Sequence, residues 1–237
     1  MGKPPDRPIA RSLQAAGPLT GARHVFAVPR LYAIIDPAQA CGRSPVEVAS
    51  ALLAVGVKII QLRDKQATSG ELYQSARRAA EGVRAGGGIF IVNDRADVAR
   101  AVDAEGVHVG QDDLPVESAR ALLGPGKIVG YSTHDLKQVR EADDTTADYI
   151  AFGPIFPTTS KENPDAVVGL AGLGEARQAT RKPLVAIGGI TLENARAVLD
   201  AGADSLAVIR GLVGAPDIRQ RAAEFLELLS RAGKGKS

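Results

Sequence analysis

Residues 57–94, VKIIQLRDKQATSGELYQSARRAAEGVRAGGGIFIVND, contain the alternation that decides the fold. An apolar run over 57–63 is followed by a segment rich in Ala, Arg and Glu over 69–86, and a second apolar run covers 88–94. Short runs of Val and Ile are typical of β-strands, whereas the longer segment has the composition of a helix. The order strand, helix, strand predicts one unit of a parallel sheet.

The same alternation repeats from Arg30 towards the end of the chain. The apolar runs cover 30–36, 57–63, 88–94, 106–111, 127–133, 149–156, 183–190 and 205–211. The helix-like segments cover 44–56, 69–86, 95–106, 115–124, 135–144, 170–180, 191–202 and 217–233. Several of these helices are expected to begin at a capping side chain, namely Ser44, Ser69, Asp135 or Thr191, and to end at a glycine.

Eight strands that alternate with eight helices predict an α/β fold, a single-domain (β/α)8 TIM barrel. The strands are nearly continuous apolar runs, which indicates burial on both faces, and closure into a barrel leaves no sheet edge exposed. An open doubly wound sheet is the alternative. That fold should have a glycine-rich dinucleotide turn after its first strand, and IIDPAQACGRSP at 34–45 is not such a turn.

The two ends of the chain differ from this pattern. Residues 1–28 are rich in Pro, Gly and Arg, and we interpret them as a flexible N-terminal extension. An organelle-targeting peptide is the alternative, but prolines at positions 4, 5 and 8 oppose the amphipathic helix that it would need. We expect the barrel over 29–232 and a disordered tail over 233–237.

The composition excludes several classes of function. A net charge of +2, an aromatic content of 4% and the absence of Trp argue against a nucleic-acid partner. Cys41 is the only cysteine, so an internal disulfide and a multi-cysteine metal site are excluded. No apolar run approaches the roughly 20 residues of a membrane helix. We expect a cytoplasmic protein without a membrane partner, and self-association into a homo-oligomer stays open.

In a TIM barrel the active site lies at the carboxyl ends of the strands, and polar residues gather there in this sequence. Gln61, Arg63 and Lys65 alternate along one strand end and should therefore share a face. Three such groups at a barrel mouth indicate a surface for an anion or a polar ligand. The alternative is an ordinary solvated strand end.

Two carboxylates follow consecutive strands. Asp94 comes after one strand, and either Asp112 or Asp113 after the next. Such a pair suits Mg²⁺, which takes one or two protein carboxylates and leaves its other positions to water and phosphate. Helix capping is the alternative, because acidic residues are favoured at helix starts. The spacing leaves open which of Asp112 and Asp113 binds and which one caps.

The stretch GPIFPTTSKENP at 153–164 places hydroxyls and Lys161 just after an apolar run. An ordinary turn would explain it, since Pro, Ser, Thr and Asn are turn formers. Together with the glycine pair 188–189, which lets backbone N–H groups approach an anion, it indicates a phosphate cradle. Two anion sites and a metal predict two phosphorylated substrates, or one diphosphate and one monophosphate, with the diphosphate as leaving group.

The remaining candidates are weaker. His108 lies within an apolar run, where a packed or supporting role is expected. His134 follows a strand and is better placed for chemistry. Cys41 has no histidine or second cysteine near it and is interpreted as a small packing or surface residue.

From about Arg30 to Leu212 the chain resembles the thiamine phosphate synthase family. The matching stretches are LYAIID, GVKIIQLRDK, IVNDRADVARAVDAEGVHVGQDD, VGYSTH, ADYIAFGPIFPTTSK, VAIGGI and AGADSLAVI, in the family's order and spacing. The resemblance implies coupling of 4-amino-5-hydroxymethyl-2-methylpyrimidine diphosphate to 4-methyl-5-hydroxyethylthiazole phosphate, or its carboxylated form. The products would be thiamine phosphate and pyrophosphate, with Mg²⁺ as cofactor.

The resemblance also implies a role for each matching position. Residues for the pyrimidine diphosphate are Gln61, Arg63, Lys65, Asn93, Ser132 and Lys161, among which Arg63, Ser132 and Lys161 would be catalytic. Residues for the thiazole phosphate are Thr158, Ser160, Gly189, Ile209 and Arg210. The metal ligands would be Asp94 and Asp113, which resolves the choice against Asp112.

Three positions depart from the family pattern: Asp64 replaces a usual Glu, Ser160 a common Thr, and Arg210 a frequent Ser. One alternative function is that of a thiazole tautomerase, a related barrel that isomerises the thiazole phosphate and needs no diphosphate or Mg²⁺ site. Another is a non-catalytic barrel that binds phosphate ligands. The joint presence of QLRDK, Asp94, Asp113 and PTTSK favours the synthase.

Overall fold

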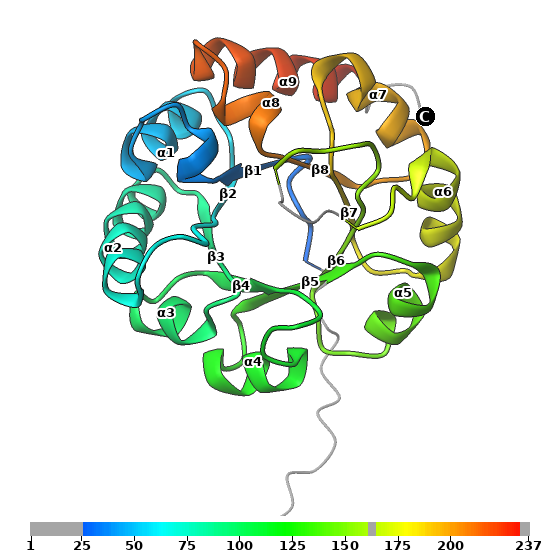
Figure 1. The fold of residues 1–237 in the computed structure, drawn as a ribbon, viewed down its shortest axis with the longest axis horizontal. Helices are drawn as coiled ribbons and strands as arrows, with labels where there is room; N and C mark the ends of the chain where they lie inside the picture. Colours follow the sequence, from blue (N-terminus) through cyan, green and yellow to red (C-terminus); the bar gives the residue numbers. More distant parts are fainter. Residues whose placement is uncertain (1–25, 161–164, 233–237) are drawn as a thin grey trace, which may run out of the picture.

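The protein is described by a computed structural model that covers residues 26–160 and 165–232. Its centre is a closed barrel in which each strand pairs in parallel with the next and β8 pairs with β1 (Figure 1). The strands are β1 (Leu31–Ile35), β2 (Ile59–Leu62), β3 (Ile89–Asn93), β4 (Gly106–Val109), β5 (Ile128–Thr133), β6 (Tyr149–Phe152), β7 (Leu184–Ile187) and β8 (Ser205–Val208). The predicted (β/α)8 barrel is confirmed.

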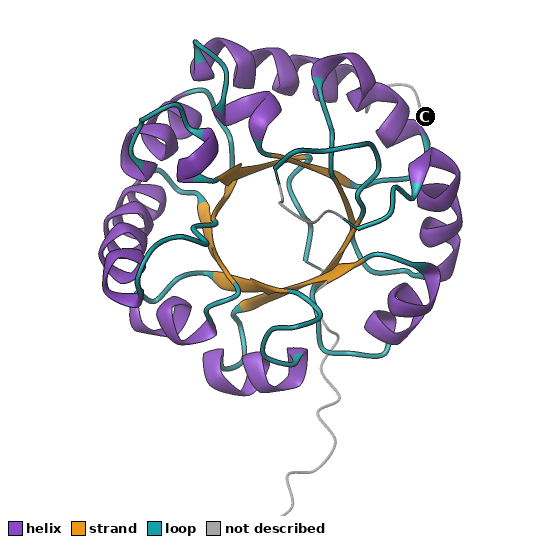
Figure 2. Ribbon diagram, in the orientation of Figure 1, coloured by secondary structure: helices purple, strands orange, loops and turns teal. Residues whose placement is uncertain are grey.

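Helices surround the barrel as an outer ring (Figure 2). They are α1 (Pro45–Ala54), α2 (Ser69–Ala85), α3 (Ala96–Ala101), α4 (Val116–Leu123), α5 (Leu136–Asp143), α6 (Gly169–Ala179), α7 (Leu192–Asp200), α8 (Arg210–Val213) and α9 (Ile218–Ala232). A 3₁₀ turn, η1 (Pro37–Gln39), follows β1. Among the described residues, no helix combines the length and the apolar content that crossing a bilayer would require.

Side-chain caps explain where several helices begin. Ser44 and Glu47 form a reciprocal capping box at the start of α1, and the Asp135 side chain accepts from the backbone N–H of Gln138 at the start of α5. The expected cap at Ser69 is wrong by one residue. Thr68 is the cap of α2, because its hydroxyl accepts from the backbone N–H of Glu71 and its backbone N–H donates to the Glu71 carboxylate.

The ends of β8 and β6 also differ from the sequence pattern. The eighth apolar run continues to Gly211, but β8 ends at Val208 and the short helix α8 begins at Arg210. The sixth run continues to Phe156, but β6 ends at Phe152, where Gly153 and Pro154 follow. A proline has no N–H to donate to a strand ladder, which accounts for the earlier end of β6.

Apolar side chains form two cores, one on each face of the barrel wall. Alternate residues of β1 illustrate the division: Leu31, Ala33 and Ile35 pack outward against the helices. Tyr32 and Ile34 instead belong to an inner cluster that fills the barrel, whose other members are Ile59, Ile91, Tyr149, Ala151, Val185 and Ala207. The inner cluster forms the floor of any site at the barrel mouth, because alternate strand residues line the interior.

The segment that precedes β1 is part of the barrel packing. Phe26 and Val28 pack against the inner cluster, and the Phe26 ring lies 6.2 Å from the Tyr149 ring, centre to centre. Figure 1 shows this segment in blue, crossing the barrel opening. The barrel packing thus includes Phe26 and Val28, two residues of the segment that the sequence pattern assigned to the extension.

Candidate active site

One large cavity opens at the carboxyl ends of the strands. Its volume is about 870 Å³, and its walls come from the loops after β2 to β8. The predicted site residues that line it are Gln61, Arg63, Lys65, Asn93, Asp94, Asp113, Ser132, Thr158, Ser160, Gly189, Ile209 and Arg210. Lys161 lies outside the described residues. Side chains separated by more than a hundred positions in sequence thus meet at one mouth, as in other barrels of this class.

The strand end QLRDK presents its alternate side chains to the cavity, as the pattern predicted. Gln61 is buried, and Arg63 donates from Nη1 to the Asp36 carboxylate at 2.5 Å. Asp36 itself is 5% exposed and also accepts from the backbone N–H of Ala38. A guanidinium has five donors, so this bond orients Arg63 and leaves others for a ligand.

Asp94 and Asp113 lie against each other at the cavity wall. The Lys65 ammonium pairs with the Asp94 carboxylate, and Asp113 accepts from the backbone N–H of Gly110 at 2.7 Å. Burial, together with the nearby Asp113 carboxyl, raises the pKa of Asp94 to about 6, although Lys65 acts in the opposite direction. Asp112 is exposed, so Asp113 is the carboxylate placed beside Asp94.

The donor set fits a hard divalent cation. Asp94 and Asp113 oppose each other's ionisation, and a bound cation would offset the repulsion between their two negative charges. Over residues 26–160 and 165–232, no group of three or more His, Cys, Asp or Glu residues could hold a metal. A pair is sufficient for Mg²⁺, which keeps water and substrate oxygens as ligands, whereas a zinc site would need three or four protein ligands.

The opposite wall is formed by the loops after β6, β7 and β8. The Thr158 hydroxyl accepts from the backbone N–H of Ser160 at 3.3 Å, and the Arg210 guanidinium donates to Thr159 Oγ1 at 2.9 Å. Gly189 has a φ of +65°, and a Cβ there would lie 2.6 Å from the Pro157 carbonyl oxygen. Only glycine lets the turn after β7 lie this close to the hydroxyl-rich loop.

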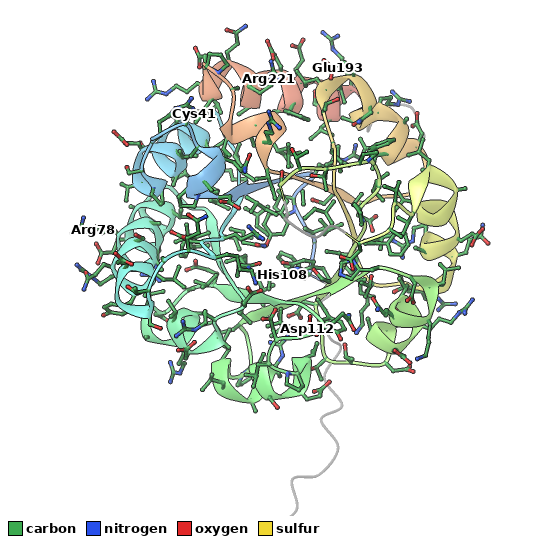
Figure 3. All side chains as sticks on the ribbon, viewed as in Figure 1. Cys41, Arg78, His108, Asp112, Glu193 and Arg221 are labelled. Atoms are coloured by element: carbon green, nitrogen blue, oxygen red, sulfur yellow. The ribbon has the colours of Figure 1, made fainter. Side chains whose placement is uncertain are left out.

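The two histidines occupy different parts of the site. His108 is on the inner wall of the barrel, whereas Arg78 projects outward from α2 (Figure 3). The Nδ1 atom of His108 lies 3.0 Å from the Tyr149 hydroxyl, and its Nε2 atom lies 2.8 Å from the Ser132 hydroxyl. His134 lies nearer the mouth, with Nδ1 2.7 Å from the Gly153 carbonyl oxygen and 3.3 Å from the Asp165 carboxylate.

Sequence reasoning assigned no role to Asp36, Tyr32 or Tyr149, although all three contact predicted site residues or supporting ones. The stretch LYAIID at 31–36 could have indicated Tyr32 and Asp36. They are separated by an even number of positions, so their side chains should point to the same side of an extended segment. Tyr149 starts β6 and lacked such a signal, since an aromatic residue in a buried strand is normally a packing residue.

Basic and hydroxyl side chains converge at the mouth of the barrel, beside the Asp94–Asp113 pair, which suits a divalent cation. The fold and the site therefore define a (β/α)8-barrel enzyme that handles phosphorylated small molecules. A family profile described as "Thiamine monophosphate synthase" matches residues 31–212. The chain belongs to that family.

Individual relatives agree with this assignment. The chain is 51% identical to a thiamine-phosphate synthase of Koribacter versatilis, over 85% of this chain and 96% of the relative. It is 46% identical to a thiamine-phosphate synthase of Shouchella clausii, over 86% of this chain and 98% of the relative. A solved thiamine phosphate pyrophosphorylase from Pyrococcus furiosus superposes with a TM-score of 0.78 at 36% identity, covering 86% of this chain and 96% of its own.

Proposed function

We propose that the protein is a thiamine-phosphate synthase. It is a transferase of thiamine biosynthesis that joins the pyrimidine methyl diphosphate to the thiazole monophosphate and releases pyrophosphate. The observation that carries this proposal is the meeting of QLRDK, the Asp94–Asp113 pair and the hydroxyl-rich loop after β6 in one cavity. The family membership supports the same reaction.

The diphosphate would occupy the side of the cavity formed by β2 to β5. Arg63, oriented by Asp36, and Lys65, next to Asp94, bring positive charge to that side. Asn93, Ser132 and Lys161 would complete this set, with Gln61 beneath the pyrimidine ring. Among these, Arg63, Ser132 and Lys161 are proposed to stabilise the charge that develops on the leaving group.

The thiazole phosphate would occupy the opposite side, formed by the loops after β6, β7 and β8. Thr158 and Ser160 offer hydroxyls there, and Gly189, Ile209 and Arg210 offer backbone groups on the cavity wall. The loops after strands seven and eight of this fold are a frequent location of phosphate sites. Arg210, which replaces a small residue common in the family, holds the loop through Thr159.

The chemistry needs no protein nucleophile. The bond between the pyrimidine methylene carbon and the diphosphate oxygen breaks, and its electron pair leaves with pyrophosphate. The cation that remains is stabilised by the amino-substituted ring, and the thiazole nitrogen then donates its lone pair to the methylene carbon. The cavity residues contribute by holding both partners in line and by opposing the charge of the leaving group.

We propose Mg²⁺ as the cofactor, held by Asp94 and Asp113. When bound, the ion supplies positive charge to the diphosphate oxygens. Lys65, which pairs with Asp94, is close enough to share its charge between that carboxylate and a diphosphate. A thiazole tautomerase is not favoured, because isomerisation needs neither the diphosphate-binding cations Arg63 and Lys65 nor the Asp94–Asp113 pair.

The test is to mix both substrates with the purified protein and Mg²⁺ and to measure pyrophosphate and thiamine phosphate. We expect the two products in equal amounts, and omission of either substrate should abolish both. A second series should supply the thiazole phosphate with and without its carboxylate, which decides the preferred form. Ligand binding without pyrophosphate release would contradict the proposal and favour a non-catalytic barrel.

A further inference from the structure

Five side chains form a continuous chain of hydrogen bonds across the inside of the barrel, at the floor of the cavity. Gln61 Nε2 donates to the Tyr32 hydroxyl at 2.8 Å, which lies 2.8 Å from the Tyr149 hydroxyl. The Tyr149 hydroxyl lies 3.0 Å from His108 Nδ1, and His108 Nε2 lies 2.8 Å from the Ser132 hydroxyl. The chain thus connects the β2 wall to the β5 wall through β1, β6 and β4.

The middle of this chain is shielded from water. Tyr32 and Tyr149 are 1% and 0% exposed, and His108 is 7% exposed. The barrel makes room for it, because a Cβ at Gly130 would overlap the Tyr149 ring. The imidazole of His108 also stacks on that ring, at 16° between planes. Burial keeps the pKa of Tyr149 well above its ordinary value, so its hydroxyl keeps its proton.

Burial restricts the direction in which the protons point. The Tyr32 oxygen accepts from Gln61, and its own proton must find an acceptor, since an unpaired buried hydroxyl is costly. The Tyr149 oxygen is that acceptor, which directs the Tyr149 proton to His108 Nδ1. A neutral imidazole that accepts at Nδ1 has its proton on Nε2 and donates it to Ser132.

We propose that this chain holds His108 as the Nε2–H tautomer and thereby makes Ser132 a hydrogen-bond donor into the cavity. Because the Ser132 oxygen accepts from His108, its proton is left for a ligand. At the other end, Gln61 uses one of its two amide N–H donors on Tyr32 and keeps its carbonyl oxygen as an acceptor. Tyr32, Tyr149 and His108 are thus positioning residues that act on Gln61 and Ser132, at the two ends of the β2–β5 side of the cavity.

The identity of the group that Ser132 meets rests on the proposed function, in which it is a diphosphate oxygen. Ionised phosphate oxygens only accept hydrogen bonds, so the direction of the hydrogen bonds along the chain decides whether Ser132 can bind one. The reverse chain, with Gln61 accepting from Tyr32, would protonate His108 on Nδ1 and use the Ser132 proton internally. Ser132 would then offer a diphosphate only lone pairs, which would repel it.

The direct test is the tautomer of His108, measured by long-range proton–nitrogen NMR correlation on protein labelled with ¹⁵N-histidine at about pH 8, above the ordinary pKa of histidine. The chain has three histidines, so a His24→Gln and a His134→Gln variant complete the assignment. We expect an unprotonated Nδ1 and a protonated Nε2 at His108. A protonated Nδ1, alone or in a doubly protonated ring, would overturn the proposal, whether or not the protein makes thiamine phosphate.

Variants test the positioning role. Tyr149→Phe should move both His108 nitrogen signals to values intermediate between the two tautomers, whereas Tyr73→Phe, on α2 outside the chain, should leave them unchanged. Unchanged signals in Tyr149→Phe would contradict the proposal. If that variant fails to fold, the wild-type spectrum alone decides the tautomer.

Kinetic constants provide a second test of the positioning role of Tyr149, because a purely structural role would give a different result. Tyr149→Phe should lower kcat about tenfold, the effect expected from losing one oriented hydrogen bond to a charged group, with both KM values little changed. In a Ser132→Ala background the same change should cause no further loss, because the two residues act through one bond. An equal additional loss in that background would overturn the positioning role.

Discussion

Asp94 shows how the requirements of the proposed metal site would oppose those of stability at a single residue. Its carboxylate is largely buried against Asp113, and its backbone has a φ of +62°, in the left-handed region. Both features are unfavourable in the metal-free chain, and both place the carboxylate at the cavity wall. Asn adopts this backbone conformation readily and removes the charge.

We therefore predict that Asp94→Asn stabilises the metal-free protein while abolishing Mg²⁺-dependent turnover. The raised pKa means that the folded state holds its proton more tightly than the unfolded state. The contribution of Asp94 to the free energy of unfolding should thus fall as the pH rises from about 4 to about 6, which the difference between wild type and variant isolates. Thermal unfolding in EDTA should show the variant about 2 kcal/mol more stable at pH 7.5, and equal to the wild type near pH 4.

Saturating Mg²⁺ provides the control for that comparison, since it should raise the melting temperature of the wild type and leave that of the variant unchanged. A variant that is less stable than the wild type in EDTA at pH 7.5 would show that the Asp94 carboxylate is not strained by its neighbour. The Lys65–Asp94 pair is half exposed on the lysine side, so its loss should contribute little.

The sequence was informative about individual residues where strand periodicity applied. Alternation placed Gln61, Arg63 and Lys65 on one face, and the cavity contains all three. It could not choose between Asp112 and Asp113, because adjacent loop residues have no fixed period. It also could not show that Ser132 and Tyr149 meet at His108, because that contact depends on barrel closure.

At the scale of elements, the turn after β7 and the loop after β6 depend on each other. The backbone N–H of Phe156 donates to the Gly188 carbonyl, and Asn194 Nδ2 donates to the Gly189 carbonyl, which ties the turn to α7. The close approach at Gly189 should therefore hold the hydroxyl-rich loop in place for a phosphate.

Gly189→Ala tests this dependence, with Gly87→Ala as a matched control. The two glycines have φ values of +65° and +66°, but a Cβ at Gly87 meets nothing within 4 Å. Both variants should lose about 1–2 kcal/mol from the backbone conformation alone. Gly189→Ala should lose more, and the KM for the thiazole phosphate should rise at least about tenfold, because the Pro157 carbonyl must move. Equal stability and equal KM values for the two variants would show that the contact does not matter.

The segment before β1 gives a second prediction at this scale. We predict that removal of residues 1–25 leaves the melting temperature unchanged, because it keeps Phe26 and Val28, which pack on the barrel floor. Removal of residues 1–28 also deletes Phe26 and Val28, which are half-buried, and should cost about 1–3 kcal/mol. Differential scanning calorimetry of both truncations decides the boundary. Identical melting temperatures for the two truncations would place the boundary between extension and barrel after residue 28.

Elements were predictable where local chemistry decides them. Ser44, Asp135 and Thr191 cap the helices that they were expected to cap. The short helix α8 was missed, because it follows the apolar run directly, begins with Arg210 and Gly211, and has no capping side chain at Ile209. Its formation depends on packing, since Leu212 and Val213 are fully buried.

At the scale of the molecule, the account depends on closure. Eight parallel strands buried on both faces leave the polar residues at their carboxyl ends in one ring, whatever their distance in sequence. The count of apolar runs predicted this closure, and closure brings the residues of the two proposed phosphate sides into one cavity. The sequence pattern could not predict the hydrogen-bonded chain across the barrel interior. Tyr32 and Tyr149 resemble ordinary core residues in sequence, and only barrel closure brings their hydroxyls together.

The central claim is that one mouth holds a metal-bound leaving group beside a second phosphate. The most direct measurement is a crystal structure with Mn²⁺, pyrophosphate and thiamine phosphate, using the anomalous signal of manganese to locate the metal. We predict a peak between the Asp94 and Asp113 carboxylates, pyrophosphate oxygens in contact with Arg63 and Lys65, and the thiamine phosphate group at Thr158 and Ser160. A metal peak away from the two carboxylates, with pyrophosphate outside the cavity, would contradict the account.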